Sequence, residues 1–277
     1  MNNPLTLGFS PCPNDTFMFY PLVHGLVDTN GISFSERLED VETLNRLAVQ
    51  GVLDVSKVSY AALGHFREQY ALLRAGSALG RGCGPLLVVK EPLAVDDLTG
   101  TTIAIPGRYT TAHLLLRLFN PGLVHVLEMP FHEIMDAVMT GRADAGVIIH
   151  ESRFTYQGFG LQQLVDLGAW WEQETGLPIP LGGIVAKRSL GGEAIRTIEQ
   201  ALSAAVEYAR ANPAAAARYI CEHAQEMSAE VCSAHIGLYV NDFSQQLGPE
   251  GEQAIVELLR RAEAAGIIPA SQAPLFI

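Results

Sequence analysis

Apolar and polar positions follow a repeating order along the first 150 residues. Short runs with the pattern of strands, such as residues 5–9 and 102–105, are each followed by a polar loop and then by apolar residues at helical spacing. Residues 32–38, 54–58 and 124–129 are further predicted strands. The order strand, loop, helix, strand, helix, strand occurs twice, and it is typical of parallel sheets covered by helices. The pattern therefore predicts an α/β protein.

An internal repeat indicates that this α/β chain forms two lobes. Residues 42–60 and residues 133–150 carry the same arrangement at an offset of 90 residues. In each copy a helix with apolar residues at i, i+3 and i+4 ends at a glycine, Gly51 or Gly141, and an aspartate three residues later precedes an apolar strand. Similarity at this spacing predicts two lobes of like construction.

The strand of the second copy is followed by four polar residues, His150, Glu151, Ser152 and Arg153. In open α/β sheets the carboxyl ends of the strands border the ligand crevice. A histidine there, beside a carboxylate and a guanidinium group, is a candidate catalytic base. The alternative is that His150 caps its strand and bonds a nearby carbonyl group. Tyr60 occupies the corresponding position in the first copy.

Two further strands predict how the lobes are connected. Residues 85–90 leave the first lobe and residues 183–187 return to it, so that two strands cross between the lobes as a hinge. The expected first lobe is discontinuous, with residues 1–88 and 185–277, and the second lobe contains residues 89–184. Helices in the C-terminal part should complete and wrap the first lobe.

Several loops carry polar groups that suit ligand binding. Residues 10–16, SPCPNDT, precede a helix and can either cap it or hold a polar or anionic group at its N-terminus. Thr110 and Thr111 occupy the same place in the second lobe. The glycines in residues 77–84 indicate a segment that passes close to a ligand or to another part of the backbone.

Two aromatic residues and two histidines near the C-terminal half are interpreted as structural. Trp170 and Trp171 either stack on a flat ligand or fill the core, and we favour the core. His223 and His235 have no partner pattern in the sequence.

Composition excludes several classes of function. The 277 residues are 48% hydrophobic and 17% charged, as in a well-packed globular protein. A net charge of −12 without a basic run argues against nucleic-acid binding. No apolar run reaches the roughly 20 residues of a membrane-spanning helix, and the N-terminus lacks a signal-peptide pattern, so we expect a cytoplasmic protein. The four cysteines lack metal-ligand spacing, so we expect reduced thiols and no metal site.

Several motifs together resemble the 1,4-dihydroxy-6-naphthoate synthase family of the futalosine menaquinone pathway. The resemblance covers residue 5 to about residue 185, and its motifs include SPCPNDTFMFYPLVHG, LEDVETLNRLA, KVSYAAL, PGRYTTA, IIHESRFTY and DLGAWWEQETGLPIPLGG. It implies a type II periplasmic-binding-protein-like fold with a ligand cleft between two lobes. It also implies a lyase that converts cyclic dehypoxanthine futalosine into 1,4-dihydroxy-6-naphthoate without a cofactor.

The resemblance assigns roles to individual residues. The essential histidine of the family corresponds to His150, and its substrate contacts correspond to Lys57, Val58, Ser59, Thr110 and Thr111. From their positions in the predicted loops and helices, we add as candidate substrate-binding residues Ser10, Asn14, Asn45 and Arg153. The expected substrate is a small anionic molecule with a sugar-derived part and a carboxylate.

Two alternatives stay open because a fold does not decide a function. The first is a cytoplasmic solute-binding or sensor module for a small carboxylate, and the second is an aromatic-acid dehydratase. The sequence leaves the oligomeric state open, with a homodimer as one outcome.

Overall fold

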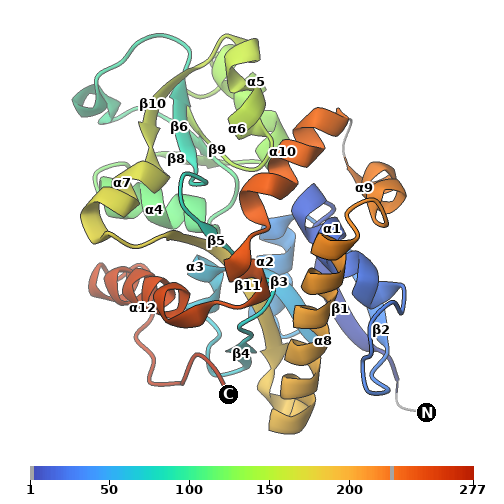
Figure 1. Cartoon of the computed structure of the whole chain (residues 1–277). Coiled ribbons are helices and arrows are strands. Elements are labelled where there is room, and N and C mark those ends of the chain that lie inside the picture. The colour runs from blue at the N-terminus through green and yellow to red at the C-terminus, as the bar shows by residue number, and fades with distance from the viewer. Residues whose placement is uncertain (1–2, 225–227) are drawn as a thin grey trace.

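The computed structural model describes residues 3–224 and 228–277, and two β-sheets organise these residues (Figure 1). The first sheet has the strand order β2-β1-β3-β11-β4, with β5 also paired to β11. Strand β1 lies between β2 and β3 and is parallel to both, whereas β11 is antiparallel to β3. The strands are β1 (Leu5–Phe9), β2 (Phe34–Leu38), β3 (Val55–Ser59), β4 (Tyr70–Leu72), β5 (Ala78–Gly80) and β11 (Ile179–Lys187).

The second sheet repeats this plan with the strand order β10-β6-β9-β7-β8. Its strand β7 is parallel to β8 and β9, and β6 is antiparallel to β9. Each sheet therefore has three parallel strands, as predicted, and is extended by antiparallel strands. Of these, β6 and β11 correspond to the two predicted hinge strands, whereas β4, β5 and β10 were not predicted. The strands are β6 (Leu86–Val89), β7 (Ile103–Ile105), β8 (Val126–Glu128), β9 (Ala145–Ile148) and β10 (Gln162–Asp166).

Helices cover both sheets. The first half contains α1 (Pro13–Val23), α2 (Val41–Val49) and α3 (Tyr60–Leu63), and the second half contains α4 (Thr111–Phe119), α5 (Ile134–Met139), α6 (Ser152–Thr155) and α7 (Leu167–Thr175). The C-terminal part contains α8 (Gly192–Ala211), α9 (Ala217–His223), α10 (Ala229–Tyr239), α11 (Asp242–Gln245) and α12 (Gly248–Ala264). Helices α8, α9 and α10 pack against α1, so the C-terminal helices complete the first half as expected.

The 90-residue repeat is present in the structure and its two copies lie in different sheets. The glycines that end the two helices have positive φ angles of 67° and 76°, a conformation that glycine adopts without strain. Three residues later, Asp54 Oδ2 accepts a hydrogen bond from the Thr6 backbone N–H at 2.9 Å, and Asp144 Oδ2 accepts one from the Thr102 backbone N–H at 2.8 Å. In each copy the aspartate thus fastens the start of one strand to the start of its parallel neighbour.

The expected hinge strands do not cross between the sheets. Strand β6 pairs with β9 and β10 of the second sheet, and β11 pairs with β3, β4 and β5 of the first. Residues 86–88, expected in the first lobe, therefore belong to the second sheet, and residues 179–184 belong to the first. We propose residues 81–85 and 176–178 as the connections between lobes.

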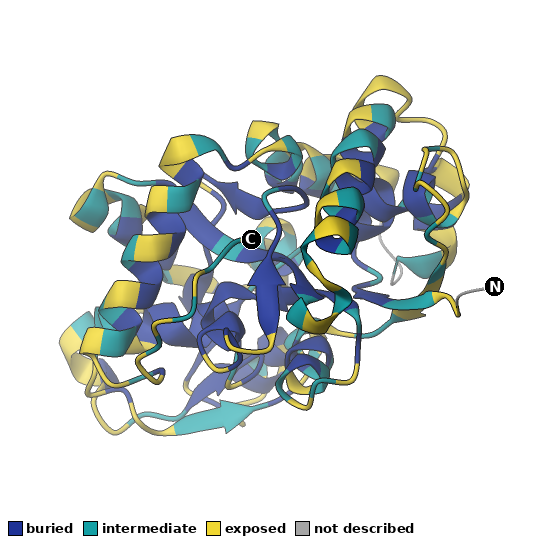
Figure 2. Cartoon of the chain, turned by 90° about the horizontal axis from the view of Figure 1, so that it is seen from below, coloured by how far each residue is buried: buried dark blue, intermediate teal, exposed yellow. Residues whose placement is uncertain are grey.

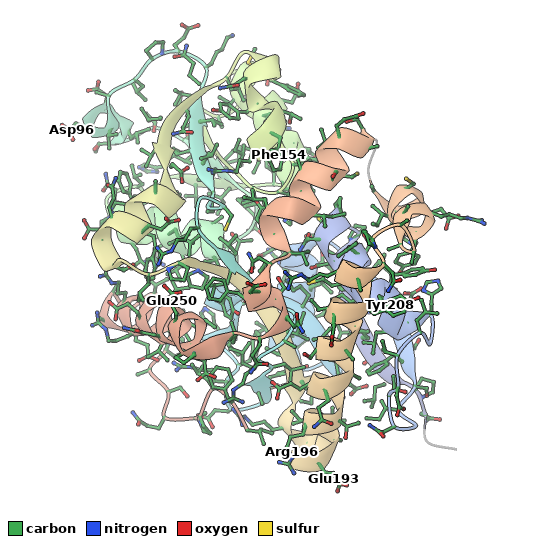
Figure 3. The ribbon with its side chains drawn as sticks, in the orientation of Figure 1. Asp96, Phe154, Glu193, Arg196, Tyr208 and Glu250 are labelled. Atoms are coloured by element: carbon green, nitrogen blue, oxygen red, sulfur yellow. The ribbon has the colours of Figure 1, made fainter. Side chains whose placement is uncertain are left out.

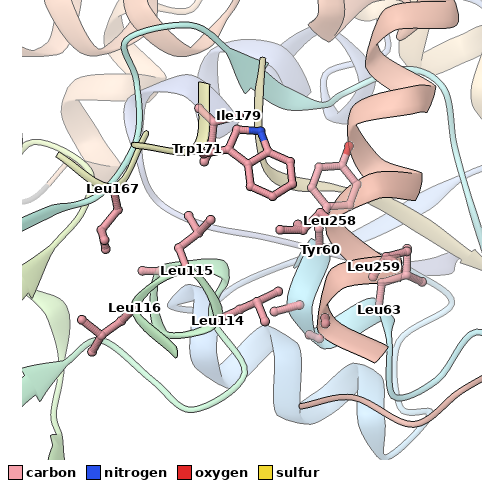
Figure 4. Close-up of a cluster of buried hydrophobic side chains, with 14 of the residues drawn as sticks. Tyr60, Leu63, Leu114, Leu115, Leu116, Leu167, Trp171, Ile179, Leu258 and Leu259 are labelled. Carbon is pink, nitrogen blue, oxygen red and sulfur yellow. The ribbon is translucent and has the colours of Figure 1, made fainter. Parts of the chain in front are cut away.

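The two halves share a hydrophobic core. One cluster joins Tyr60, Leu115, Trp171 and Leu258, which come from α3, α4, α7 and α12 (Figure 4). Trp171 is fully buried and donates a hydrogen bond from Nε1 to the Pro178 carbonyl oxygen at 3.1 Å, which confirms its interpretation as a core residue. The strands are mostly buried, and the exposed residues lie on the outer sides of helices and in loops (Figure 2).

Some charged side chains lie at the periphery, far from the junction of the halves. Figure 3 shows Asp96 at the outer edge of the second half and Glu193 at the opposite end of the molecule, on α8. Both residues are exposed. These two carboxylates are therefore solvated rather than directed toward the junction.

The glycine-rich segment predicted to approach a ligand or a backbone approaches a backbone. A Cβ atom on Gly84 would lie 2.3 Å from the Cα atom of Gly168. A backbone atom cannot move away as the end of a side chain can, so Gly84 allows this close packing of two segments at the start of the second half.

Candidate active site

A cavity lies between the two halves, where four parallel strands end. In the first sheet β1 leads into Ser10 and β3 ends at Ser59, and in the second β7 leads toward Thr110 and β9 into His150. The carboxyl ends of the strands therefore border one space, as the α/β pattern predicts. The cavity has a volume of about 90 Å³.

All the predicted site residues except Asn45 and Arg153 line this cavity. The first half contributes Ser10, Asn14, Lys57, Val58 and Ser59, and the second contributes Thr110, Thr111 and His150. The structure thus brings together residues that are as far as 140 positions apart in the sequence. Their contact with a substrate stays a prediction.

A buried ion pair forms part of the cavity wall. Lys57 Nζ lies 2.9 Å from Asp15 Oδ1, and the two side chains are only 7% and 2% exposed. The other carboxylate oxygen, Asp15 Oδ2, accepts hydrogen bonds from Ser10 Oγ at 2.7 Å and from the Ser10 backbone N–H at 3.2 Å. The partners of Asp15 are thus all donors, as a buried carboxylate requires.

Thr111 joins the second half to the first at the N-terminus of α4, next to Thr110. Thr111 Oγ1 donates to the Leu181 carbonyl oxygen at 2.6 Å and accepts from the Ala61 backbone N–H at 3.3 Å. Thr110 caps the helix, because its Oγ1 accepts from the His113 backbone N–H at 3.3 Å. The first N–H groups of a helix lack partners within the helix, so α4 presents backbone donors to the cavity.

Two of the predicted substrate contacts, Asn45 and Arg153, do not line the cavity. Asn45 is fully buried and does not line the cavity. Its Oδ1 accepts from the Ser59 backbone N–H at 2.8 Å and its Nδ2 donates to Ser59 Oγ at 3.1 Å, so it positions Ser59 instead. The guanidinium of Arg153 donates to the Gly84 carbonyl oxygen at 2.6 Å and to Asp166 Oδ2 at 2.8 Å.

His150 lies two residues after the end of β9 and has a positive φ angle of 56°, unusual for a residue other than glycine. Its ring lies 5.0 Å from the Phe131 ring and 5.9 Å from the His235 ring, measured between centroids. Burial lowers the pKa of His150, and the carboxylate of Glu151 opposes this effect only in part. The imidazole is therefore neutral near pH 7, as a general base must be.

His235 and Tyr239 of α10 also line the cavity, and the sequence reasoning missed both. His235 was interpreted as structural, but its Nε2 lies 2.9 Å from Asn14 Oδ1 and its ring stacks near His150. The spacing of four residues places both side chains on one face of α10. That face was not identifiable from the sequence, because apolar residues surround this helix without forming one stripe.

Glu42 connects the two halves beside the cavity. Its carboxylate accepts a hydrogen bond from the Tyr109 backbone N–H at 3.1 Å, and Arg46 pairs with both Glu42 and Glu128 of β8. A Cβ atom on Gly107 would lie 2.3 Å from Glu42 Oε2, so only glycine leaves room for this carboxylate. Burial raises the pKa of Glu42 to about 7.

The Glu42→Gln variant is expected to change how stability depends on pH. The raised pKa means that the folded protein binds this proton more tightly than the unfolded chain, so the contribution of Glu42 to stability falls as pH rises from about 4.5 to about 7. Glutamine keeps an acceptor for the Tyr109 N–H but has no charge to desolvate. The Tm of the variant minus the Tm of wild type should therefore increase by at least about 2 °C from pH 5 to pH 8, the response expected for about 1 kcal/mol. Parallel Tm curves for the two proteins would contradict this assignment.

The described residues contain no cluster of three or more metal-ligating side chains, and no helix among them is long and apolar enough to cross a bilayer. All four cysteines are free. Burial raises the pKa of the Cys12 thiol, and burial also raises the pKa of Cys83 to about 12, so both are poor nucleophiles at neutral pH.

Comparison with known proteins decides the family. A family model described as menaquinone biosynthesis matches residues 5–264. A protein of Thermus thermophilus named 1,4-dihydroxy-6-naphthoate synthase is 52% identical over 273 residues, which is 99% of each chain. A protein of Streptomyces coelicolor with the same name is 49% identical over 271 residues, covering 96% of this chain and 95% of its own. The chain belongs to the 1,4-dihydroxy-6-naphthoate synthase family. It is therefore an enzyme of menaquinone biosynthesis.

Solved structures place this naphthoate synthase family member in the expected fold class. A crystal structure of a protein from Archaeoglobus fulgidus has a TM-score of 0.90 and 35% identity, covering 96% of this chain and 98% of its own. The alkanesulfonate-binding protein of Xanthomonas axonopodis pv. citri has a TM-score of 0.72 at 14% identity, covering 97% of this chain and 95% of its own. A Candida albicans protein with the generic periplasmic-binding-protein fold has a TM-score of 0.68 at 15% identity, covering 98% of this chain and 92% of its own. The two-lobed α/β fold is thus confirmed, and these distant likenesses concern the fold alone.

Proposed function

We propose that the enzyme converts cyclic dehypoxanthine futalosine into 1,4-dihydroxy-6-naphthoate with His150 as the general base. The family assignment supports the reaction. The observation that carries the role of His150 is its place in the cavity, where it is the histidine contributed by the second half and lies opposite the polar groups of the first. A lowered pKa keeps this imidazole available to accept a proton.

The proposed reaction begins with proton removal. His150 takes a proton that the substrate carbonyl group has made acidic, and the electron pair moves onto the carbonyl oxygen to give an enolate-like state. The bond to the sugar-derived carbons then breaks, and formation of the aromatic ring drives the reaction forward. The proton held on His150 is afterwards available to the leaving fragment, so that the imidazole returns to its neutral form.

Lys57 and the N-terminus of α4 are the proposed partners of the substrate carboxylate. Lys57 is a cation in the cavity wall, whereas Arg153 is engaged elsewhere. Backbone N–H groups at the start of α4 add donors and a positive helix dipole. These local groups can hold an anion although the whole chain carries a net charge of −12.

Substrate entry requires the two halves to separate. The cavity volume of about 90 Å³ is well below the roughly 300–1,000 Å³ of pockets that enclose a small organic ligand. Contacts that join the halves beside the cavity, such as those of Thr111 and Glu42, would open for entry and close again around the substrate. Closure excludes water while the enolate-like state exists.

The proposal is tested by incubating the purified enzyme with cyclic dehypoxanthine futalosine and following the naphthoate absorbance and the mass of the product. We expect 1,4-dihydroxy-6-naphthoate and one equivalent of the sugar-derived fragment. Binding without turnover would favour the competing function, a solute-binding module, because the fold is shared with an alkanesulfonate-binding protein. A different aromatic product would indicate a dehydratase.

A further inference from the structure

His235 occupies an unusual position between the two halves of the site. It lies on α10, which packs against α1 of the first half, yet its ring is nearly parallel to that of His150 from the second half, at 12° and 5.9 Å. The Tyr239 ring contacts it from the next turn of α10, with centroids 4.7 Å apart. The side chain is fully buried and lines the cavity. Its ring is therefore held firmly beside the proposed base.

A chain of hydrogen bonds determines which nitrogen of His235 carries the proton. Asp15 Oδ1 accepts from Lys57 Nζ and from Asn14 Nδ2, both at 2.9 Å. Because a carboxylate oxygen needs a donor, Asn14 must direct its NH₂ group toward Asp15 and its Oδ1 toward His235. An amide oxygen in turn needs a donor, so His235 Nε2 carries a proton and donates it to Asn14 Oδ1 at 2.9 Å. Asn14, predicted as a substrate contact, thus has both ends of its amide engaged.

The other ring nitrogen of His235 is consequently an acceptor. Burial lowers the pKa of His235 well below its usual value, and the nearby His150 and Lys57 lower it further, so the ring stays neutral. In a neutral imidazole with the proton on Nε2, Nδ1 has a free lone pair. Nδ1 is buried and has no hydrogen-bond partner among residues 3–224 and 228–277. Buried polar atoms of native proteins nearly always have a partner, and an exception calls for an explanation.

We propose that His235 is a second substrate-contacting histidine, whose Nδ1 accepts a hydrogen bond from a hydroxyl group of the sugar-derived part of the substrate. This inference rests on the proposed function and assigns different tasks to the two imidazoles. His150 takes a proton from carbon, whereas His235 receives a hydroxyl donor and keeps its own protonation unchanged. The chain of hydrogen bonds from Lys57 through Asp15 and Asn14 keeps the proton of His235 on Nε2, so that Nδ1 can accept the hydroxyl.

Two variants test the contributions of the two ring nitrogens of His235 separately. Glutamine places its amide nitrogen near the position of Nε2, so His235→Gln keeps the donor to Asn14 and removes the acceptor. Asparagine places its amide oxygen near the position of Nδ1, so His235→Asn keeps an acceptor and removes the donor to Asn14. We expect kcat/KM to fall about 10-fold in the glutamine variant, as for loss of one hydrogen bond, and to fall less in the asparagine variant.

The matched control is His223→Gln on α9. His223 Nδ1 contacts the Tyr219 carbonyl oxygen of its own helix, and the residue does not line the cavity. This variant should retain wild-type kcat/KM. Thermal unfolding of all three variants shows whether a loss of activity reflects a loss of folded protein.

Substrate analogues that each lack one hydroxyl of the sugar-derived part identify the contact. For the analogue without the contacted hydroxyl, wild type and His235→Gln should have equal kcat/KM, because the interaction is then missing from both. If His235→Gln lowers kcat/KM by the same factor for every analogue, or has wild-type kcat/KM for the full substrate, the inference is overturned. Failure of the proposed function gives a different result, namely no naphthoate from the wild-type enzyme.

Discussion

Replacement of His150 is expected to lower kcat by at least about 100-fold, the lower end of the contribution of a general base. The substitution needs care because His150 has a φ angle of 56°. Alanine is strained in this region, whereas asparagine adopts it more readily. His150→Asn should therefore remove the base without disturbing the backbone, and His150→Ala should give the same kinetic loss with slightly lower stability. Initial rates of naphthoate formation and Tm values measure the two effects separately.

The pH profile of the wild-type enzyme provides an independent check on the same residue. A general base works only when unprotonated, and burial lowers the pKa of His150 from 6.5. We expect kcat/KM to be constant near pH 7 and to decline with unit slope only at a pH below 6.5. Turnover within a few fold of wild type in the asparagine variant would remove His150 from the mechanism.

Replacement of Lys57 by methionine is expected to reduce the free energy of unfolding by about 3–5 kcal/mol, the cost of breaking a buried ion pair. The reason is that the carboxylate of Asp15, whose side chain is 2% exposed, would be left in the interior without its cationic partner. Ser10 and Asn14 would still donate to the carboxylate, but neither carries a positive charge. Urea denaturation at pH 7 measures the loss.

A double variant separates stability from activity at this pair. Lys57→Met combined with Asp15→Leu removes both charges and should recover most of the lost stability, since apolar replacement of a buried pair is often neutral. Naphthoate formation should stay impaired, because the cavity has lost the proposed partner of the substrate carboxylate. A single variant as stable as wild type would show that the pair contributes little to folding.

The sequence allowed prediction of those features that depend on local chemistry. Gly51 and Gly141 end helices, and Asp54 and Asp144 follow them at equal spacing, so the repeat is visible from turn chemistry and helical periodicity alone. The same local order identified the strand that leads to His150. Because strand ends in this architecture converge, most of the predicted site residues line one cavity.

Features that depend on tertiary packing were not predictable. The sequences of β6 and β11 indicate strands, but nothing local shows that each pairs only within one sheet. Arg153 follows His150 closely, yet the left-handed turn at His150 and the short helix α6 direct the guanidinium toward Asp166. His235 reaches the site only because α10 packs on α1 after a long intervening chain.

The pairing of β11 has a consequence for the order in which the protein forms during synthesis. The strands of the second sheet lie within residues 86–166, so all of them are synthesised before β11. The first sheet instead cannot be completed until β11 is synthesised. Strand β11 lies between β3 and β4 in the sheet but follows β3 by more than 100 residues in the sequence. Until then β3 has an unpaired edge that can bind other extended chains. The half that is translated second is thus expected to mature first, and the early half stays vulnerable to aggregation for longer.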